Sequence, residues 1–260
     1  MNLKRKYVLT AGLPRSGTTL LGTILNQNPQ ISSSISGPLA RFARSIITES
    51  SSQGGYQYEC PPEKRKKLIA GLFANYYDDP DKTICVNHNR GWPLLMPTIK
   101  DLYPETKLIL CVRDIGWILD SFETLQRKNP YTFTKIFSQE ENTNVYTRCE
   151  TLLHPGRTLG FAYDAVKQAI TSEFKHDIMV IEYNILAQQP ETTLRAVYNF
   201  IEEPYYPHDF DNVAASYDEF DEDVQLPGLH TTRKKVEFIQ RDTVIPPDIW
   251  QRVKGMEVWR

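Results

Sequence analysis

The sequence has little net charge, few cysteines and no long apolar segment, and each of these features excludes a class of protein. Its 30 lysines and arginines nearly balance 32 aspartates and glutamates, so we expect no nucleic-acid partner. The four cysteines, Cys60, Cys85, Cys111 and Cys149, show no paired metal-ligand spacing. The apolar run before Gly12 is too short for the core of a signal peptide, and no later run approaches a membrane span. We therefore expect a cytoplasmic protein with reduced thiols.

A phosphate-binding loop without its lysine lies close to the N-terminus. The segment "AGLPRSGTTL" contains Gly12 and Gly17 with four residues between them. In ATP- and GTP-binding loops the next residue is a lysine that reaches the β and γ phosphates, but here it is Thr18, and Arg15 lies inside the loop. A strand that turns sharply into a helix aims backbone N–H groups and the positive end of the helix dipole at one point. The loop therefore indicates an anion site that works without a metal ion.

Strand-like and helix-like segments alternate along the chain. Short apolar or β-rich runs predict strands at 7–13, 83–88, 107–112 and 177–183. Apolar residues at helical spacing predict helices at 17–27, 41–47, 61–77, 93–103, 115–125, 157–174 and 190–201. Unbroken apolar strands are typical of a sheet that is buried on both faces. We predict an α/β, P-loop-like three-layer fold with a central parallel sheet covered by helices on both faces.

Four segments have weaker patterns. Residues 32–38 are predicted to form a loop, and residues 126–155 show no clear period and are predicted to form an excursion near the ligand. The acidic stretch 209–224 is interpreted as a solvated surface segment. No internal repeat or linker divides the chain, so we expect one domain over residues 1–260, with an irregular segment at 204–260.

Three motifs together resemble the sulfotransferases that use 3′-phosphoadenosine 5′-phosphosulfate (PAPS). The first is the run Pro14-Arg15-Ser16-Gly17-Thr18-Thr19, which matches the family's 5′-phosphosulfate loop. The second is Arg113 after a buried strand with Ser121 eight residues later, the pair that holds the 3′-phosphate in the family. The third is "IEYNILAQQPETTLRAVYNFIEEP", which places Tyr183 beside the nucleotide. The matches run in the family's order over residues 7–204.

The resemblance implies a fold, a co-substrate and a reaction. PAPS would donate a sulfuryl group to a hydroxyl or an amine by in-line displacement, leaving adenosine 3′,5′-bisphosphate (PAP), with no metal ion. The acceptor would be a small molecule, a glycan or a peptide, and the chain looks closer to the tyrosylprotein and carbohydrate branches than to the cytosolic steroid and phenol branch. The sequence leaves two alternatives open: a P-loop kinase or nucleotide hydrolase, and a degenerate nucleotide-binding protein.

Two residues are predicted to carry the catalysis. Arg15 is expected to stabilise the leaving phosphate. His88 ends a predicted strand, where ligands of open parallel sheets gather, and its position resembles that of a catalytic histidine in the cytosolic sulfotransferases. It is interpreted as the base, with two alternatives: an electrophile, or a structural residue at the end of the strand. His230 is a weaker candidate for the base. The glutamate base of the tyrosylprotein branch would fall near Ser36, where no acid lies, and this departure counts against a protein tyrosine as the acceptor.

A basic run in the C-terminal segment is the last predicted element of the site. Arg233, Lys234 and Lys235 follow one another within "GLHTTRKKVEF". The run is either a solvated basic surface or part of a late loop that closes over the 3′-phosphate, as the resemblance implies. We expect the second.

Overall fold

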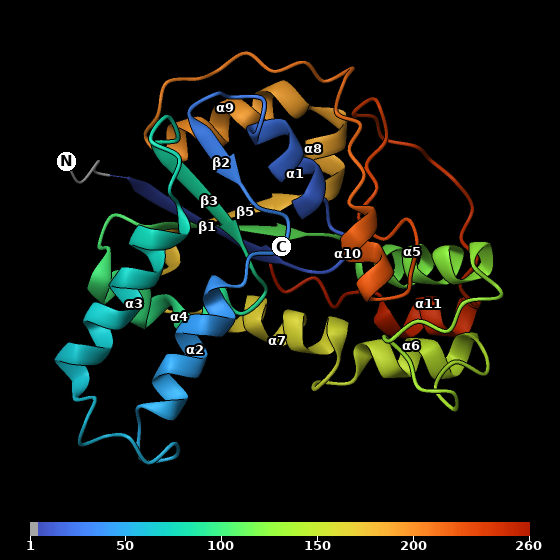
Figure 1. The fold of residues 1–260 in the computed structure, drawn as a ribbon. Helices are drawn as coiled ribbons and strands as arrows, with labels where there is room; N and C mark the ends of the chain where they lie inside the picture. Colours follow the sequence, from blue (N-terminus) through green and yellow to red (C-terminus); the bar gives the residue numbers. More distant parts are fainter. Residues whose placement is uncertain (1–4) are drawn as a thin grey trace.

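The computed structural model describes residues 5–260, and a single parallel sheet organises them (Figure 1). The strand order is β2-β3-β1-β4-β5, and every neighbouring pair is parallel. The strands are β1 (Lys6–Gly12), β2 (Ile31–Ser33), β3 (Ile84–His88), β4 (Lys107–Val112) and β5 (Ile178–Glu182). All carboxyl ends therefore meet at one edge of the sheet.

Helices cover the two faces of this sheet. In Figure 1, α1, α8 and α9 lie on one side, and α3, α4 and α7 lie on the other. The helices of the first half of the chain are α1 (Thr18–Leu25), α2 (Leu39–Glu49), α3 (Pro62–Tyr76), α4 (Trp92–Leu102) and α5 (Ile115–Lys128). Those of the second half are α6 (Val145–Leu153), α7 (Thr158–Ile170), α8 (Tyr183–Gln188), α9 (Pro190–Phe200), α10 (Asp218–Asp223) and α11 (Pro247–Val253).

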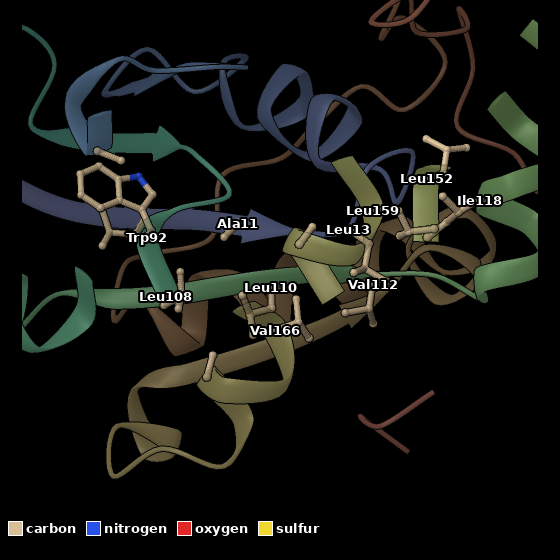
Figure 2. Packing of buried hydrophobic residues seen from close by; sticks show 14 of the residues in the cluster. Ala11, Leu13, Trp92, Leu108, Leu110, Val112, Ile118, Leu152, Leu159 and Val166 are labelled. Carbon is tan, nitrogen blue, oxygen red and sulfur yellow. The ribbon is translucent and has the colours of Figure 1, made fainter. Parts of the chain in front are cut away.

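The central strands β1, β3 and β4 are largely buried, and their successive side chains point to opposite faces of the sheet. In β4, Leu108 and Leu110 belong to one apolar cluster and Ile109 to the other. Figure 2 shows the larger cluster, in which β-strand residues such as Leu110 pack against Val166 of α7. Two apolar layers on either side of one parallel sheet confirm the predicted α/β three-layer fold.

Several short elements were missed by the sequence patterns, among them β2 and α6. Residues 31–33 form the short edge strand β2, where a loop was expected, because they pair in parallel with β3. Helix α6 lies within 126–155, where no period was visible. Its start is fixed by a capping box in which the Asn144 side chain accepts from the N–H of Thr147 and the Thr147 hydroxyl accepts from the N–H of Asn144. The helix has nine residues, which is too short for a clear apolar period.

The C-terminal segment also differs from the expectation in one respect. The acidic stretch contains helix α10, and Asp221 within it is only 1% exposed, so the interpretation as a wholly solvated surface was wrong. Much of the segment lacks regular structure, as expected, and it packs back onto the sheet domain through Val213, Leu226, Val236 and Ile245, which are all buried. Among residues 5–260, no helix is both long and apolar enough to cross a bilayer.

Candidate active site

A cavity of about 1090 Å³ opens at the carboxyl ends of the strands, where the sequence predicted the site. Loops that follow β1, β3, β4 and β5 all contribute to it, together with the C-terminal segment. Of the predicted site residues, those that line the cavity are Pro14, Arg15, Gly17, Thr18, Thr19, His88, Arg113, Ser121, Tyr183, Arg233 and Lys235. Ser16 and Lys234 are the two that do not.

The loop after β1 has the geometry of an anion cradle. Gly12 has φ 135°, and a side chain there would collide with the Cys111 backbone of the neighbouring strand. Gly17 has φ 91° and precedes α1, and a Cβ at this position would lie 2.9 Å from the Tyr183 ring. No side chain caps the N-terminus of α1, so the first backbone N–H groups of this helix remain free to bind an anion.

Ser16 has a structural role in this loop. Its side chain is fully buried, and its hydroxyl oxygen lies 2.6 Å from the carbonyl oxygen of Leu13 and 2.8 Å from that of Cys111. A hydroxyl that donates its one proton to these carbonyls fastens the loop to β4. The Ser16 hydroxyl is thus directed at these carbonyl oxygens and not into the cavity, and the backbone N–H of Ser16 is the group left for an anion.

Four predicted residues from distant parts of the chain form one cluster. Arg15 Nε donates to Ser121 Oγ at 3.0 Å, and Arg113 Nη1 donates to the backbone oxygen of Arg15 at 3.2 Å. The Arg113 guanidinium also stacks on the Tyr183 ring, 4.3 Å from its centroid. These contacts join the loop after β1, the end of β4, helix α5 and the start of α8.

The two arginines of this cluster are charged groups in an unfavourable environment. Burial, followed by the nearby Arg113, lowers the pKa of Arg15 from its ordinary value to about 10. Burial also lowers the pKa of Arg113, whose Nε is buried without a hydrogen-bond partner. Within residues 5–260, neither guanidinium has an acidic ion-pair partner. A bound anion would relieve both the repulsion and the desolvation, which makes this pair a candidate anion site.

His88 lies in the cavity as a neutral imidazole. Its Nδ1 is 3.3 Å from the Thr10 hydroxyl of the adjacent strand β1. Burial lowers the pKa of His88 from 6.5 to about 3, with smaller contributions from Arg90 and His230. The ring is thus unprotonated near neutral pH, as a general base must be. A bound anion nearby would raise the pKa of His88 and so its affinity for a proton.

A second histidine in the cavity is held by a buried carboxylate. His230 Nδ1 lies 2.6 Å from Asp221 Oδ1, and the backbone N–H of His230 donates to both Asp221 oxygens at 3.1 Å. The edge of the Phe220 ring packs against the imidazole. Because a carboxylate only accepts, Nδ1 carries the proton and Nε2 is left to accept one. Burial lowers the pKa of His230, and the hydrogen bond to Asp221 opposes that shift.

The predicted basic run lies at the rim of the cavity. Arg233, Lys234 and Lys235 are all exposed, and Lys235 pairs with Asp211 at 2.8 Å. The C-terminal segment is fixed at another point, which the sequence did not reveal. Arg241 lines the cavity and pairs with Asp120, which is fully buried and also accepts from the backbone N–H of Val244 at 2.8 Å. Among residues 5–260, no group of three or more acidic, histidine or cysteine side chains is arranged to hold a metal ion.

Two comparisons with known protein sequences point to sulfotransferases. The sequence model of the sulfotransferase family matches residues 8–207. A Caenorhabditis briggsae protein with the provisional name protein-tyrosine sulfotransferase is 22% identical over 204 residues. The alignment covers 77% of this chain, and the chain spans 66% of that relative, which is just under two thirds of its length.

Solved structures with a similar fold include two sulfotransferases and a retinol dehydratase. The sulfotransferase domain of the curacin biosynthetic pathway has a TM-score of 0.55 at 14% identity, with 97% of each chain covered. The sulfotransferase of Alicyclobacillus acidocaldarius gives 0.51 at 16% identity, covering 84% of this chain and 89% of its own. Retinol dehydratase, solved with retinol and PAP, gives 0.52 at 12% identity, covering 98% and 81%. The family match over residues 8–207 confirms the family predicted from the motifs: this chain belongs to the sulfotransferase family.

Proposed function

We propose that the protein transfers the sulfuryl group of PAPS to a hydroxyl or amine acceptor by in-line displacement. The observation that carries the proposal is the cluster of Arg15, Ser121, Arg113 and Tyr183 beside a free helix N-terminus. A 5′-phosphosulfate and a 3′-phosphate are two anions on one nucleoside, and this cluster supplies two separate cations. A kinase loop needs one lysine and a magnesium ion instead.

Each part of the nucleotide has a proposed partner. The N–H groups at the start of α1, the hydroxyls of Thr18 and Thr19, and Arg15 would hold the 5′-phosphosulfate. Arg113 and Ser121 would hold the 3′-phosphate, and Tyr183 would lie beside the nucleoside. Pro14, the backbone of Ser16 and Gly17 would shape the loop, while Arg233, Lys234 and Lys235 would close over the 3′-phosphate from the rim.

The chemistry needs a positioned acceptor, a stabilised leaving group and a base. An acceptor oxygen or nitrogen forms a bond to sulfur while the bond from sulfur to the bridging phosphate oxygen breaks. The electron pair of that bond leaves with the phosphate of PAP, where Arg15 stabilises it. The acceptor's proton passes to a neutral imidazole.

Two histidines are candidates for this base, and different observations support them. His88 lies in a segment that resembles the one with the catalytic histidine of the cytosolic sulfotransferases, and its neutral ring lines the cavity. His230 has the better preorganised ring, because Asp221 fixes its tautomer and stabilises the imidazolium that forms. We propose His230 as the base, with His88 next to the reacting group. If His88→Asn abolishes turnover and His230→Asn does not, the two roles are reversed.

Calorimetry with PAP and with ADP tests the function. We expect PAP to bind far more tightly than ADP, because Arg113 and Ser121 gain a partner only from a 3′-phosphate. Ser121→Ala should reduce this preference, whereas Ser172→Ala, in the turn after α7 and outside the residues that line the cavity, should not. Equal affinities for PAP and ADP in the wild-type protein would refute the proposal. Turnover is then measured from the mass of the sulfated acceptor. It should persist in the presence of EDTA, because the proposed reaction uses no metal ion.

A further inference from the structure

The cavity has a second half that the nucleotide residues do not occupy. The sheet order places β1, β4 and β5 together, and Arg15, Arg113 and Tyr183 follow these three strands. On the other side of β1 lie β3 and β2, which lead into His88 and helix α2. The strand order therefore separates a nucleotide half from an acceptor half, with the loop after β1 between them.

The acceptor half is basic. Arg41 and Arg44 line the cavity from α2, and their spacing of three residues puts them on one face of that helix. Arg90 lines it from the loop after β3. All three side chains are exposed to solvent, and within residues 5–260 none of them forms an ion pair. Glu237 is the one acidic residue among the described residues that line the cavity.

These arginines come from segments that touch each other. Asn89 Nδ2 donates to the backbone oxygen of Gly37 at 2.8 Å, and the N–H of Gly37 donates to the backbone oxygen of His88 at 2.7 Å, so the loop after β3 is hydrogen-bonded to the segment before α2. Arg90 Nη1 donates to the backbone oxygen of Thr158 at 3.2 Å, which ties it to the start of α7. The surrounding protein atoms lower the pKa of the Arg90 guanidinium by desolvation even though solvent reaches the side chain. Because no acid pairs with these three guanidinium groups within residues 5–260, an anion that enters this half of the cavity would meet cations that are not already neutralised.

We propose that the acceptor is itself an anion, a hydroxyl or amino compound whose carboxylate or phosphate group is bound by Arg41, Arg44 and Arg90. This inference rests on the proposed sulfuryl transfer, and it adds the substrate class. Guanidinium groups suit planar, two-point recognition of a carboxylate or phosphate. Binding the acid group in this half would hold the reacting hydroxyl or amine near His88 and His230, which line the same cavity.

Matched acceptor pairs test the proposal on the PAP-saturated protein. Calorimetry would compare glucuronate with glucose, 4-hydroxyphenylacetate with its amide, and glucose 6-phosphate with glucose. We expect the charged member of at least one pair to bind tenfold or more tightly than its neutral partner. The carboxylate and phosphate arms show which acid group is preferred. Arg41→Gln combined with Arg44→Gln should bring the two members of that pair to within about threefold of each other, because each substitution removes a charge-assisted donor.

Controls separate this inference from the proposed function. Lys67→Gln combined with Lys167→Gln removes two exposed charges of α3 and α7 outside the cavity and should leave the preference unchanged. The proposal is overturned if no charged compound binds more tightly than its partner, or if the preference survives in the Arg41/Arg44 variant. It is also overturned if that variant loses affinity for PAP, because the arginines would then bind the nucleotide. Failure of the wild-type protein to bind PAP would refute the proposed function instead, whatever the anion preference.

Discussion

Replacing Asp221 with asparagine tests the proposed base through a single hydrogen bond. In the structure the buried Asp221 carboxylate faces Nδ1 of His230 at 2.6 Å, which leaves Nε2 unprotonated. When the asparagine oxygen takes the place of Oδ2, it still accepts from the backbone N–H of His230, and the amide nitrogen takes the place of Oδ1 and donates to Nδ1. The imidazole proton would move to Nε2, so the nitrogen proposed to accept the acceptor's proton would become a donor.

The size of the effect follows from the lost proton transfer. General base catalysis contributes about 10²–10⁴ to a rate, and kcat of Asp221→Asn should fall by about this factor. Affinity for PAP should stay equal or rise slightly, because the Asp221 charge acts on Arg15 and raises its pKa. The Asp221 charge and its hydrogen bond raise the pKa of His230 and so oppose the effect of burial. Their loss should lower this pKa further, and the acid limb of the pH–rate profile should therefore shift to lower pH.

The assay measures kcat with the genuine acceptor, the affinity for PAP by calorimetry, and the His230 tautomer from its ¹⁵N chemical shifts. Asp223→Asn is the matched control, because Asp223 lies on the same helix α10 but is exposed and pairs only with Lys135 at the surface. It should change none of the three. If Asp221→Asn switches the tautomer and kcat stays within about twofold of wild type, His230 is not the base.

The sheet and the nucleotide motifs could be predicted because each depends on residues that are close together in the sequence. The run "LILCV" before Arg113 is apolar throughout, and only a strand covered on both faces needs that composition. Gly12 and Gly17 mark the turns with positive φ that bring the backbone around an anion. The parallel topology then brings Arg15, Arg113 and Tyr183 to one edge of the sheet, which is why residues far apart in the sequence meet in one cavity.

The partners of these residues could not be predicted, since they depend on how irregular segments fold back. Asp221 lies in an acidic stretch whose composition is typical of solvated surface, and only its contact with His230 distinguishes it. Ser16 reads as a phosphate ligand in the motif, but the approach of the Cys111 carbonyl oxygen redirects its hydroxyl. The three consecutive basic residues Arg233 to Lys235 were predicted as site residues because of their charge. Arg241 is a single arginine outside any basic run, and it is the residue that pairs with the buried carboxylate of Asp120.

Two further predictions concern the charged and titrating groups of the cavity. Arg15→Ala removes a charge-assisted donor worth about 1.5–3 kcal/mol, so calorimetry should show PAP binding weakened by about ten- to hundredfold, with turnover reduced as well. Unchanged PAP affinity would remove Arg15 from the phosphosulfate site. His88→Asn should change the stability at low pH, because the folded protein holds the pKa of His88 at about 3, below its ordinary value of 6.5. Between these two values the unfolded chain binds a proton that the folded protein excludes, so this histidine lowers the free energy of unfolding by about 1.4 kcal/mol for each unit of decreasing pH. Urea unfolding at pH 7 and at pH 4.5 should therefore show a smaller loss of stability in His88→Asn than in the wild-type protein, and an equal loss in both would mean that His88 is protonated in the folded state.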